Sequence, residues 1–224
     1  MKNLKYAILA LTLAVLATTS SFANTIPVFS TGAGLTSGGQ ADPHYSIVSV
    51  PFSAPPPGPA LTTTAYPGWV AAPSGTQWVN SWGYDNPDTP AGTYDYQTTF
   101  DLTGLDFHTA ELSGFWAADD TGYILLNGVA AVGTGTVLSD PGFQSLTAFD
   151  ITGGFHAGVN TLDFIVTNDD LFGGGGDGIA TGLLVQIQGT ASPAPEPSSL
   201  LLMGSGLLGV AGVLRRKLAA TSQQ

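Results

Sequence analysis

Short runs of alternating apolar and polar residues fill the middle of the chain, and turn residues separate them. In residues 93–101, Tyr94, Tyr96, Thr98 and Phe100 occupy every second position, and mostly polar side chains lie between them. A period of two residues predicts a β-strand with one buried face. The same reasoning predicts strands at residues 46–52, 77–82, 109–117, 123–126, 129–132, 146–151, 160–167 and 183–188.

Turn residues between these runs indicate how the strands connect. Asn127-Gly128 stands between two of them, and this pair suits the positive φ angles of a type I′ turn, so a β-hairpin is expected there. The proline-rich segment 54–60 is expected to be a loop. No stretch of residues 24–190 has a convincing helical period. We therefore expect one all-β domain over residues 24–190, a two-sheet β-sandwich of the jelly-roll type.

Apolar segments of a different kind lie at the two ends of the chain. Residues 1–23 have Lys2 and Lys5, then an apolar stretch, then a small-x-Ala ending at Ala23, which predicts a secretory signal peptide. Residues 191–224 contain a proline-rich linker, an uncharged apolar segment at 198–214 and a basic cluster. That segment is at the short end of the length that spans a bilayer, and a basic cluster after it favours the cytoplasmic side. We expect a single transmembrane helix at 198–214.

The order of features in this C-terminal region is more specific than any one of them. Pro195, Glu196 and Pro197 precede the apolar segment, and Arg215, Arg216 and Lys217 close it. The arrangement resembles the PEP-CTERM sorting signal of Gram-negative bacteria. The resemblance implies an exosortase as processing partner, a transient inner-membrane anchor, and release to the cell surface or extracellular matrix. The alternative is a permanently anchored, single-span envelope protein.

The charge distribution excludes one class of partner. All five basic residues lie in the two sorting segments, whereas of the sixteen acidic residues only Glu196 lies outside residues 24–190. Binding to DNA or RNA needs clustered Lys and Arg, so nucleic acid is excluded as a partner.

The chain has no Cys, so no disulfide stabilises the exported domain.

Several acidic and amide side chains fall where strands are expected to end. Ca²⁺ prefers oxygen ligands from such groups, and glycine lets backbone carbonyls approach an ion. The sequence thus predicts a structural calcium site. The alternative is turn formation, which Asp and Asn favour through local hydrogen bonds. The candidate ligands are Asp119, Asp120, Asn168, Asp169, Asp170 and Asp177.

A row of aromatic residues offers a second candidate site. Trp78, Trp82 and Tyr84, together with Asn80, occupy alternate positions, so an extended chain would point them the same way. Such a row can stack on sugar rings, and Trp78, Trp82 and Tyr84 are the candidate glycan contacts. The alternative is that the row belongs to the core, because aromatic side chains supply much buried area.

Four segments in order suggest a relationship for the domain itself. Residues 94–100, 115–120, 124–128 and 158–164 give a strand, an acidic turn, an Asn-Gly hairpin and a Gly-x-Asn-x-Leu strand entry. This order is similar to that in the galactose-binding-domain-like jelly rolls. The resemblance implies a glycan-binding module, often with a structural calcium ion.

Motifs for catalysis are missing from the sequence. His44, His108 and His156 are scattered without the spacing of a zinc site, and there is no Gly-x-Ser-x-Gly nucleophile motif. We expect a non-catalytic exported protein that associates with extracellular polysaccharide. A hydrolase or lyase acting on glycans from a jelly-roll fold is the alternative.

Overall fold

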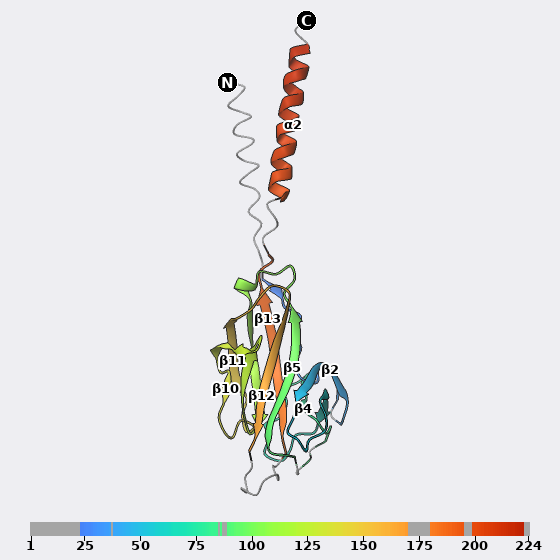
Figure 1. Ribbon diagram of the computed structural model, residues 1–224, viewed down its shortest axis with the longest axis vertical. Coiled ribbons are helices and arrows are strands. Elements are labelled where there is room, and N and C mark those ends of the chain that lie inside the picture. The colour runs from blue at the N-terminus through green and yellow to red at the C-terminus, as the bar shows by residue number, and fades with distance from the viewer. Residues whose placement is uncertain are drawn as a thin grey trace. The chain divides into compact units, whose positions relative to one another are not determined.

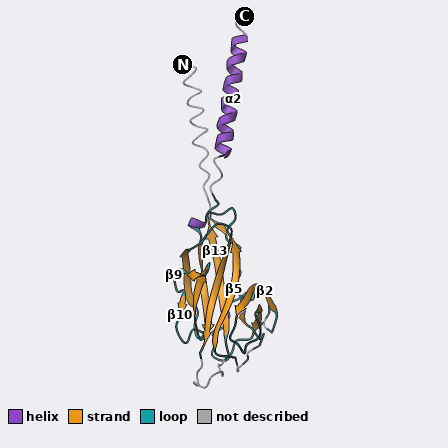
Figure 2. Cartoon of the chain, viewed as in Figure 1, coloured by secondary structure: helices purple, strands orange, loops and turns teal. Residues whose placement is uncertain are grey.

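A computed structural model describes residues 23–36, 38–84, 86, 89–169, 180–194 and 199–221. Up to Pro193 its regular structure is β-strand except for one 3-10 turn at Phe107–Thr109 (Figure 2). The strands are β1 (Asn24–Thr25), β2 (Ala41–Ser49), β3 (Gly58–Thr63), β4 (Trp78–Asn80), β5 (Gly92–Asp101), β6 (Glu111–Asp119), β7 (Thr121–Leu126), β8 (Val129–Ala130), β9 (Val132–Thr134), β10 (Val137–Leu138), β11 (Thr147–Gly153), β12 (Val159–Asn168) and β13 (Gly182–Ala191). The all-β prediction is confirmed.

Hydrogen bonds join these strands into one antiparallel sheet. Across the described residues its order is β10-β7-β12-β5-β2-β3-β4-β13-β6-β11-β9, with β1 beside β13 and β8 beside β7. The long strands β5, β12 and β13 run along the body (Figure 1). Two separate sheets are not shown, because β2, β3 and β4 connect the β12 side to the β13 side by continuous pairing.

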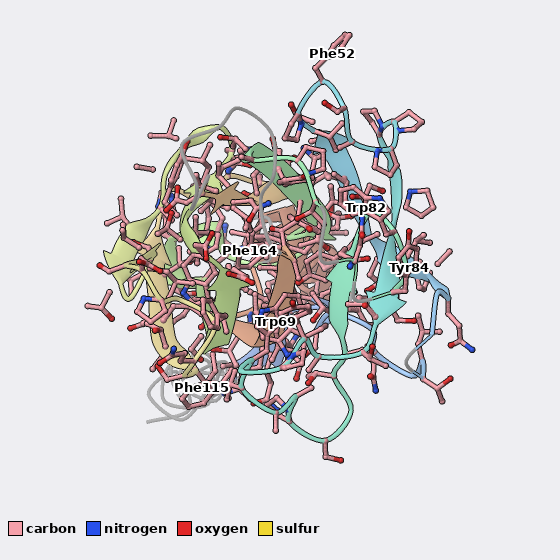
Figure 3. The ribbon with its side chains drawn as sticks, turned by 90° about the horizontal axis from the view of Figure 1, so that it is seen from below. Phe52, Trp69, Trp82, Tyr84, Phe115 and Phe164 are labelled. Atoms are coloured by element: carbon pink, nitrogen blue, oxygen red, sulfur yellow. The ribbon has the colours of Figure 1, made fainter. Side chains whose placement is uncertain are left out.

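The main core lies where this sheet folds over on itself. Phe164 of β12 is fully buried, and its ring centroid lies 5.6 Å from that of Trp116 on β6 and 6.4 Å from that of Phe149 on β11. Tilted and edge-to-face ring pairs at such distances are favourable beyond the area they bury. Figure 3 shows Phe164 near the middle of the body, whereas Phe52 projects from a loop into solvent. The two sides of the sheet are therefore held together by aromatic packing.

Local sequence rules explain the strands that flank this core. On β5 the buried residues are Tyr94, Tyr96, Thr98 and Phe100, which is the face that the alternating pattern predicts. The predicted hairpin also forms: Asn127 and Gly128 have φ angles of 54° and 76°, and Leu126 pairs with Val129 across the turn. Both φ values are those that a type I′ turn requires.

One predicted loop is partly wrong. Segment 54–60 ends in a strand, because β3 begins at Gly58 and Pro59 pairs with Ser46 of β2. Proline is tolerated here because β4 pairs only with Leu61–Thr63 of β3, so no strand adjoins Pro59 on the second side.

A smaller apolar cluster lies on the outer face of β4, β6 and β13. It contains Trp69, Trp78, Ala117, Ala180 and Leu184, with Tyr66 and Phe143 packed against it. Leu184 pairs with Ala117 in the β13–β6 ladder, and their neighbours Leu183 and Ala118 point the opposite way into the main core. Residues 65–77 and 143–146 thus cover this face, as satellite clusters under long loops commonly do.

The chain divides into two compact units, the first ending at Pro193 and the second beginning at Ala194. We call residues 24–193 the body. The body contains both apolar clusters, and its first strand β1 pairs with its last, β13, so it has a complete core of its own. The second unit contains helix α2 (Ser199–Thr221). Residues 1–22, which carry most of the predicted signal peptide, lie outside the described residues.

Over the described part of the chain, no helix is both long enough and apolar enough to cross a membrane. The transmembrane span predicted at 198–214 is therefore not found, although a helix does form there. Four glycines in α2, at positions 204, 206, 209 and 212, contribute no apolar side chain. The helix also continues through Arg215 and Arg216 rather than ending before them.

Candidate ligand-binding pocket

A tight turn places two aromatic rings beside one end of the sheet. Residues Tyr66 to Trp69 form the turn, with the Trp69 N–H donating to the Tyr66 carbonyl at 2.9 Å. Gly68 has a φ angle of 100° and follows Pro67, the arrangement of a type II turn. The Trp69 ring lies 4.2 Å from the Trp78 ring and 6.3 Å from the Tyr66 ring, measured between centroids. This turn sets Trp69 between the buried Trp78 and the partly exposed Tyr66.

The end of β6 supplies two buried carboxyl groups to the same place. Trp69 Nε1 donates to Asp119 Oδ2 at 2.7 Å, and the Thr181 hydroxyl donates to the Asp119 carbonyl at 2.7 Å. Asp120 Oδ2 accepts from the Asp169 N–H at 2.8 Å, which ties the end of β12 to this corner. Asp119 and Asp120 are each only 5 % exposed. Hydrogen bonds from three other parts of the chain, at Trp69, Thr181 and Asp169, therefore fix their positions.

A loop before β11 closes the third side. The Gly142 N–H donates to the Asp120 carbonyl at 2.7 Å, and the Val70 N–H donates to the Phe143 carbonyl at 2.8 Å. A Cβ on Gly142 would lie 2.6 Å from the Asp120 oxygen, so only glycine lets the loop approach this closely. The loop thereby brings Asp140 and Phe143 opposite the turn that carries Trp69.

These three elements enclose a pocket of about 210 Å³. It lies at the end of the body where β6 ends and β13 begins, since Gly182 pairs with Asp119. The other end of β13 pairs with Asn24, roughly 30 Å away at the usual rise of a ten-residue strand. The pocket is thus remote from the point where the body joins the C-terminal region. Its lining residues are Tyr66, Pro67, Trp69, Asp119, Asp120, Asp140 and Phe143.

The acidic groups of the pocket lack any basic neighbour within the body. Burial raises the pKa of Asp119 well above its usual range, the hydrogen bond and charge of Asp120 raise it further, and the Trp69 hydrogen bond only partly opposes this. The pKa of Asp169 is also raised, by burial and then by the charges of Asp120 and Asp140. Residues 24–190 contain no Lys or Arg to offset these charges. The negative charge of the pocket is therefore not offset by any Lys or Arg side chain of the body.

The structure brings together only part of the predicted calcium site. Asp119 and Asp120 line the pocket, and Asp169 adjoins it through the hydrogen bond from its N–H to Asp120. The Asn168 amide instead donates to Thr89 Oγ1 at 2.9 Å and to the Pro90 carbonyl at 3.1 Å. Asp170 and Asp177 lie outside the described residues. Among the residues that are described, no group of three or more His, Cys, Asp or Glu side chains is arranged to hold a metal ion. Calcium binding stays a prediction from the sequence.

The predicted aromatic row does not share one face. Trp78 is 1 % exposed and joins the outer cluster, whereas Trp82 packs against the main core near Tyr94. The alternation ends at Asn80, whose side-chain oxygen accepts from the N–H groups of Trp82 and Gly83 and turns the chain. Tyr84 is 54 % exposed. Trp78 has no ring face open to a sugar, and the tryptophan that lines a pocket is Trp69, which the sequence did not single out.

A second hollow, of about 340 Å³, lies on the outer face of β6 and β13. Phe115 is 45 % exposed there and pairs with Gln186, while Ser113 pairs with Gln188. The alternation of β6 explains it, because burial of Trp116 turns Phe115 outward. Among its described lining residues this hollow combines neutral polar groups with one aromatic ring and has no charged side chain.

Comparison with known proteins identifies the C-terminal region. Residues 193–217 match the PEP-CTERM protein-sorting motif. The match contains Pro195, Glu196 and Pro197, which lie outside the described residues, and the basic cluster through Lys217. Such a motif indicates an exported protein that is held transiently at the membrane and sorted by an exosortase, as the sequence predicts. The chain matches no curated protein.

Proposed function

We propose that the body is a non-catalytic glycan-binding module, exported and then released by an exosortase near Pro195–Pro197 to act in an extracellular polysaccharide matrix. The observation that carries the proposal is the pocket built from Tyr66, Trp69 and Phe143 beside carboxyl groups. A galactose-binding-like jelly roll is the fold relationship that we propose for the body.

The chemistry of the pocket suits a sugar. Tyr66 and Phe143 are partly exposed and can cover the apolar face of a sugar ring, while the nearly buried Trp69 forms the floor. Asp120 and Asp140 offer carboxylate oxygens that accept charge-assisted hydrogen bonds from hydroxyl groups. A volume of about 210 Å³ is smaller than the pockets that enclose drug-sized ligands, so it suits one sugar residue of a longer chain.

Glycan hydrolysis is the competing function, and one observation favours it. Asp119, whose pKa is raised, lies beside a second carboxyl group, and glycosidases use a pair of carboxyl groups of which the acid has a raised pKa. However, the Asp119 and Asp120 side chains hydrogen-bond to each other, whereas glycosidase carboxyl groups flank the scissile bond at about 5 Å or more. Their arrangement favours binding over cleavage.

A glycan array with the purified body, in the presence and absence of Ca²⁺, tests the proposal. We expect retention of at least one glycan class, which Tyr66→Ala weakens. Tyr123→Ala is the matched control, because Tyr123 is 44 % exposed on β7 and does not line the pocket. Turnover of a bound glycan would overturn the non-catalytic assignment. Retention of no glycan would instead leave a structural or protein-binding role.

A further inference from the structure

We propose that the glycan recognised by this pocket carries a free, protonated amine, so that the ligand is a polymer containing deacetylated amino sugars. This inference rests on the proposed function and specifies its ligand. It follows from three features of the pocket: the rings that line it, the carboxyl groups that adjoin them, and the lack of any counter-charge in the body.

The rings provide the first half of a cation site. Trp69, Tyr66 and Phe143 come from two separate loops and line the same pocket. The faces of aromatic rings carry negative potential, and cations within about 6 Å of a ring centroid are attracted to them. Trp69 is held in place by its hydrogen bond to Asp119 and by Trp78 behind it, so it is already ordered before a ligand arrives. A neutral sugar would gain only stacking from these rings, whereas an ammonium group gains the electrostatic attraction as well.

The carboxyl groups provide the second half. Asp120 and Asp140 line the pocket and Asp169 adjoins it, so three acidic groups other than Asp119 repel one another there. The body has no Lys or Arg that could supply a counter-charge. Its three histidines lie away from the pocket, since His44 stacks on Phe29 and His108 lies against Phe107. The third, His156, follows β11. A bound cation would relieve this repulsion, and none of these side chains lines the pocket to do so.

Two observations favour an amino sugar over a basic peptide. The pocket holds about 210 Å³, and the partly exposed rings of Tyr66 and Phe143 line it. The apolar C–H face of a sugar ring can cover them while its amine reaches Asp120. A lysine side chain would place its charge in the pocket but offers no ring to cover the aromatic walls, and its flexible stem loses more conformational entropy on binding.

Isothermal titration calorimetry with two matched oligosaccharides tests the inference. The probes are the β-1,4-linked hexamer of glucosamine and the same hexamer of N-acetylglucosamine, which differ in the charge of the amine and the acetyl group. We expect the glucosamine hexamer to bind the body at least about tenfold more tightly, since hydrogen bonds to charged groups exceed those between neutral groups. Its affinity should fall when the salt concentration rises from about 50 to about 500 mM, because salt screens charge attraction. Hexalysine is titrated in parallel.

Variants assign the binding to the pocket. Asp120→Asn keeps an oxygen for the Asp169 N–H but removes the charge, and we expect about tenfold weaker binding of the glucosamine hexamer. Asp140→Asn, at an exposed position, should weaken it several-fold. Glu111→Gln is the matched control, because Glu111 is exposed at the opposite end of β6 and its loss changes the net charge equally.

The outcomes separate the inference from the proposed function. Equal affinity for the two hexamers, or preference for the acetylated one, overturns the amine assignment but leaves glycan binding standing. Equal effects of Asp140→Asn and Glu111→Gln would show that net charge, rather than the pocket, attracts the ligand, and would also overturn it. Hexalysine binding as tightly as the glucosamine hexamer overturns the assignment to a sugar. Binding of no glycan of any kind contradicts both.

Discussion

Replacing Asp119 by asparagine should stabilise the body at neutral pH, although it changes a buried, hydrogen-bonded residue. The carboxyl group is 5 % exposed, and burial together with Asp120 raises its pKa. The asparagine side chain would keep an oxygen that accepts from Trp69 Nε1, and its amide can donate to Asp120 where the wild-type carboxyl shares a proton. The substitution therefore preserves the hydrogen bonds and removes the need to bury a charge or retain a proton.

The sign of the effect follows from proton linkage. In the unfolded chain Asp119 ionises near its ordinary pKa of about 3.9, whereas in the folded body it keeps its proton to a higher pH. Between these two values the unfolded state binds fewer protons, so the wild-type free energy of unfolding falls as pH rises. The loss is absent below about pH 4. At pH 7 it is at most about 4 kcal/mol, from about three pH units at about 1.4 kcal/mol each.

Local relaxation around Asp119 makes the actual loss of wild-type stability smaller than this maximum. We therefore expect Asp119→Asn to raise the free energy of unfolding at pH 7 by about 1–3 kcal/mol. For a body of this size, such a gain raises the melting temperature by a few degrees or more. Urea unfolding of wild-type and Asp119→Asn bodies at pH 4 and pH 7 measures the difference. Glu111→Gln controls for the general benefit of removing one negative charge. An equal loss of stability at both pH values would refute the reasoning, because it would mean that the carboxyl group acts only as a hydrogen-bond acceptor.

Three further predictions concern charge, metal and processing. Burial and the charge of Asp163 raise the pKa of Asp95 to about 6, so its contribution to stability falls between about pH 4 and pH 6. Asp95→Asn should reduce the fall in the free energy of unfolding over this pH range by up to roughly 1 kcal/mol, a small effect because solvent screens this half-exposed group. An unchanged dependence on pH would contradict the raised pKa of Asp95. Millimolar Ca²⁺ should raise the melting temperature of the body, and superimposable curves with Ca²⁺ and with a chelator, at equal ionic strength, would remove the calcium prediction. Intact-mass analysis of the extracellular protein should find a chain that begins at Asn24 and ends near residues 195–197, whereas recovery of the basic cluster 215–217 would exclude cleavage by an exosortase.

Local rules were sufficient for much of the sheet. The alternation of Tyr94, Tyr96, Thr98 and Phe100 identifies both the strand and its buried face, and Asn127-Gly128 identifies a hairpin from turn geometry alone. The same rules failed at Asn80, because its side chain accepts hydrogen bonds from the N–H groups of Trp82 and Gly83, which turns the chain. Trp78 and Trp82 therefore lie in different clusters. Whether strands link into one sheet depends on contacts between distant residues, and the alternating pattern carries no information about them.

The pocket, like the sheet, could be predicted from the sequence only in part. The acidic pair Asp119-Asp120 could be singled out, since adjacent carboxyl groups at the end of an expected strand are candidate ligands for an ion. Its partner Trp69 lies fifty residues earlier in the chain, and no periodic pattern connects the two. The available signal was the Tyr66-Pro67-Gly68-Trp69 segment, a predictable type II turn with an aromatic residue on each side. The turn could be foreseen, but the surface against which it packs could not.

Binding of the body to the extracellular polysaccharide of the producing bacterium tests the central claim most directly. Wild-type, Tyr66→Ala and Tyr123→Ala bodies would be sedimented with the purified polysaccharide, after their melting temperatures have shown that all three are folded. We predict that the wild-type and Tyr123→Ala bodies sediment with the polymer and that Tyr66→Ala stays mostly in solution. Equal sedimentation of all three would place binding outside the pocket, and sedimentation of none would contradict the glycan-binding function.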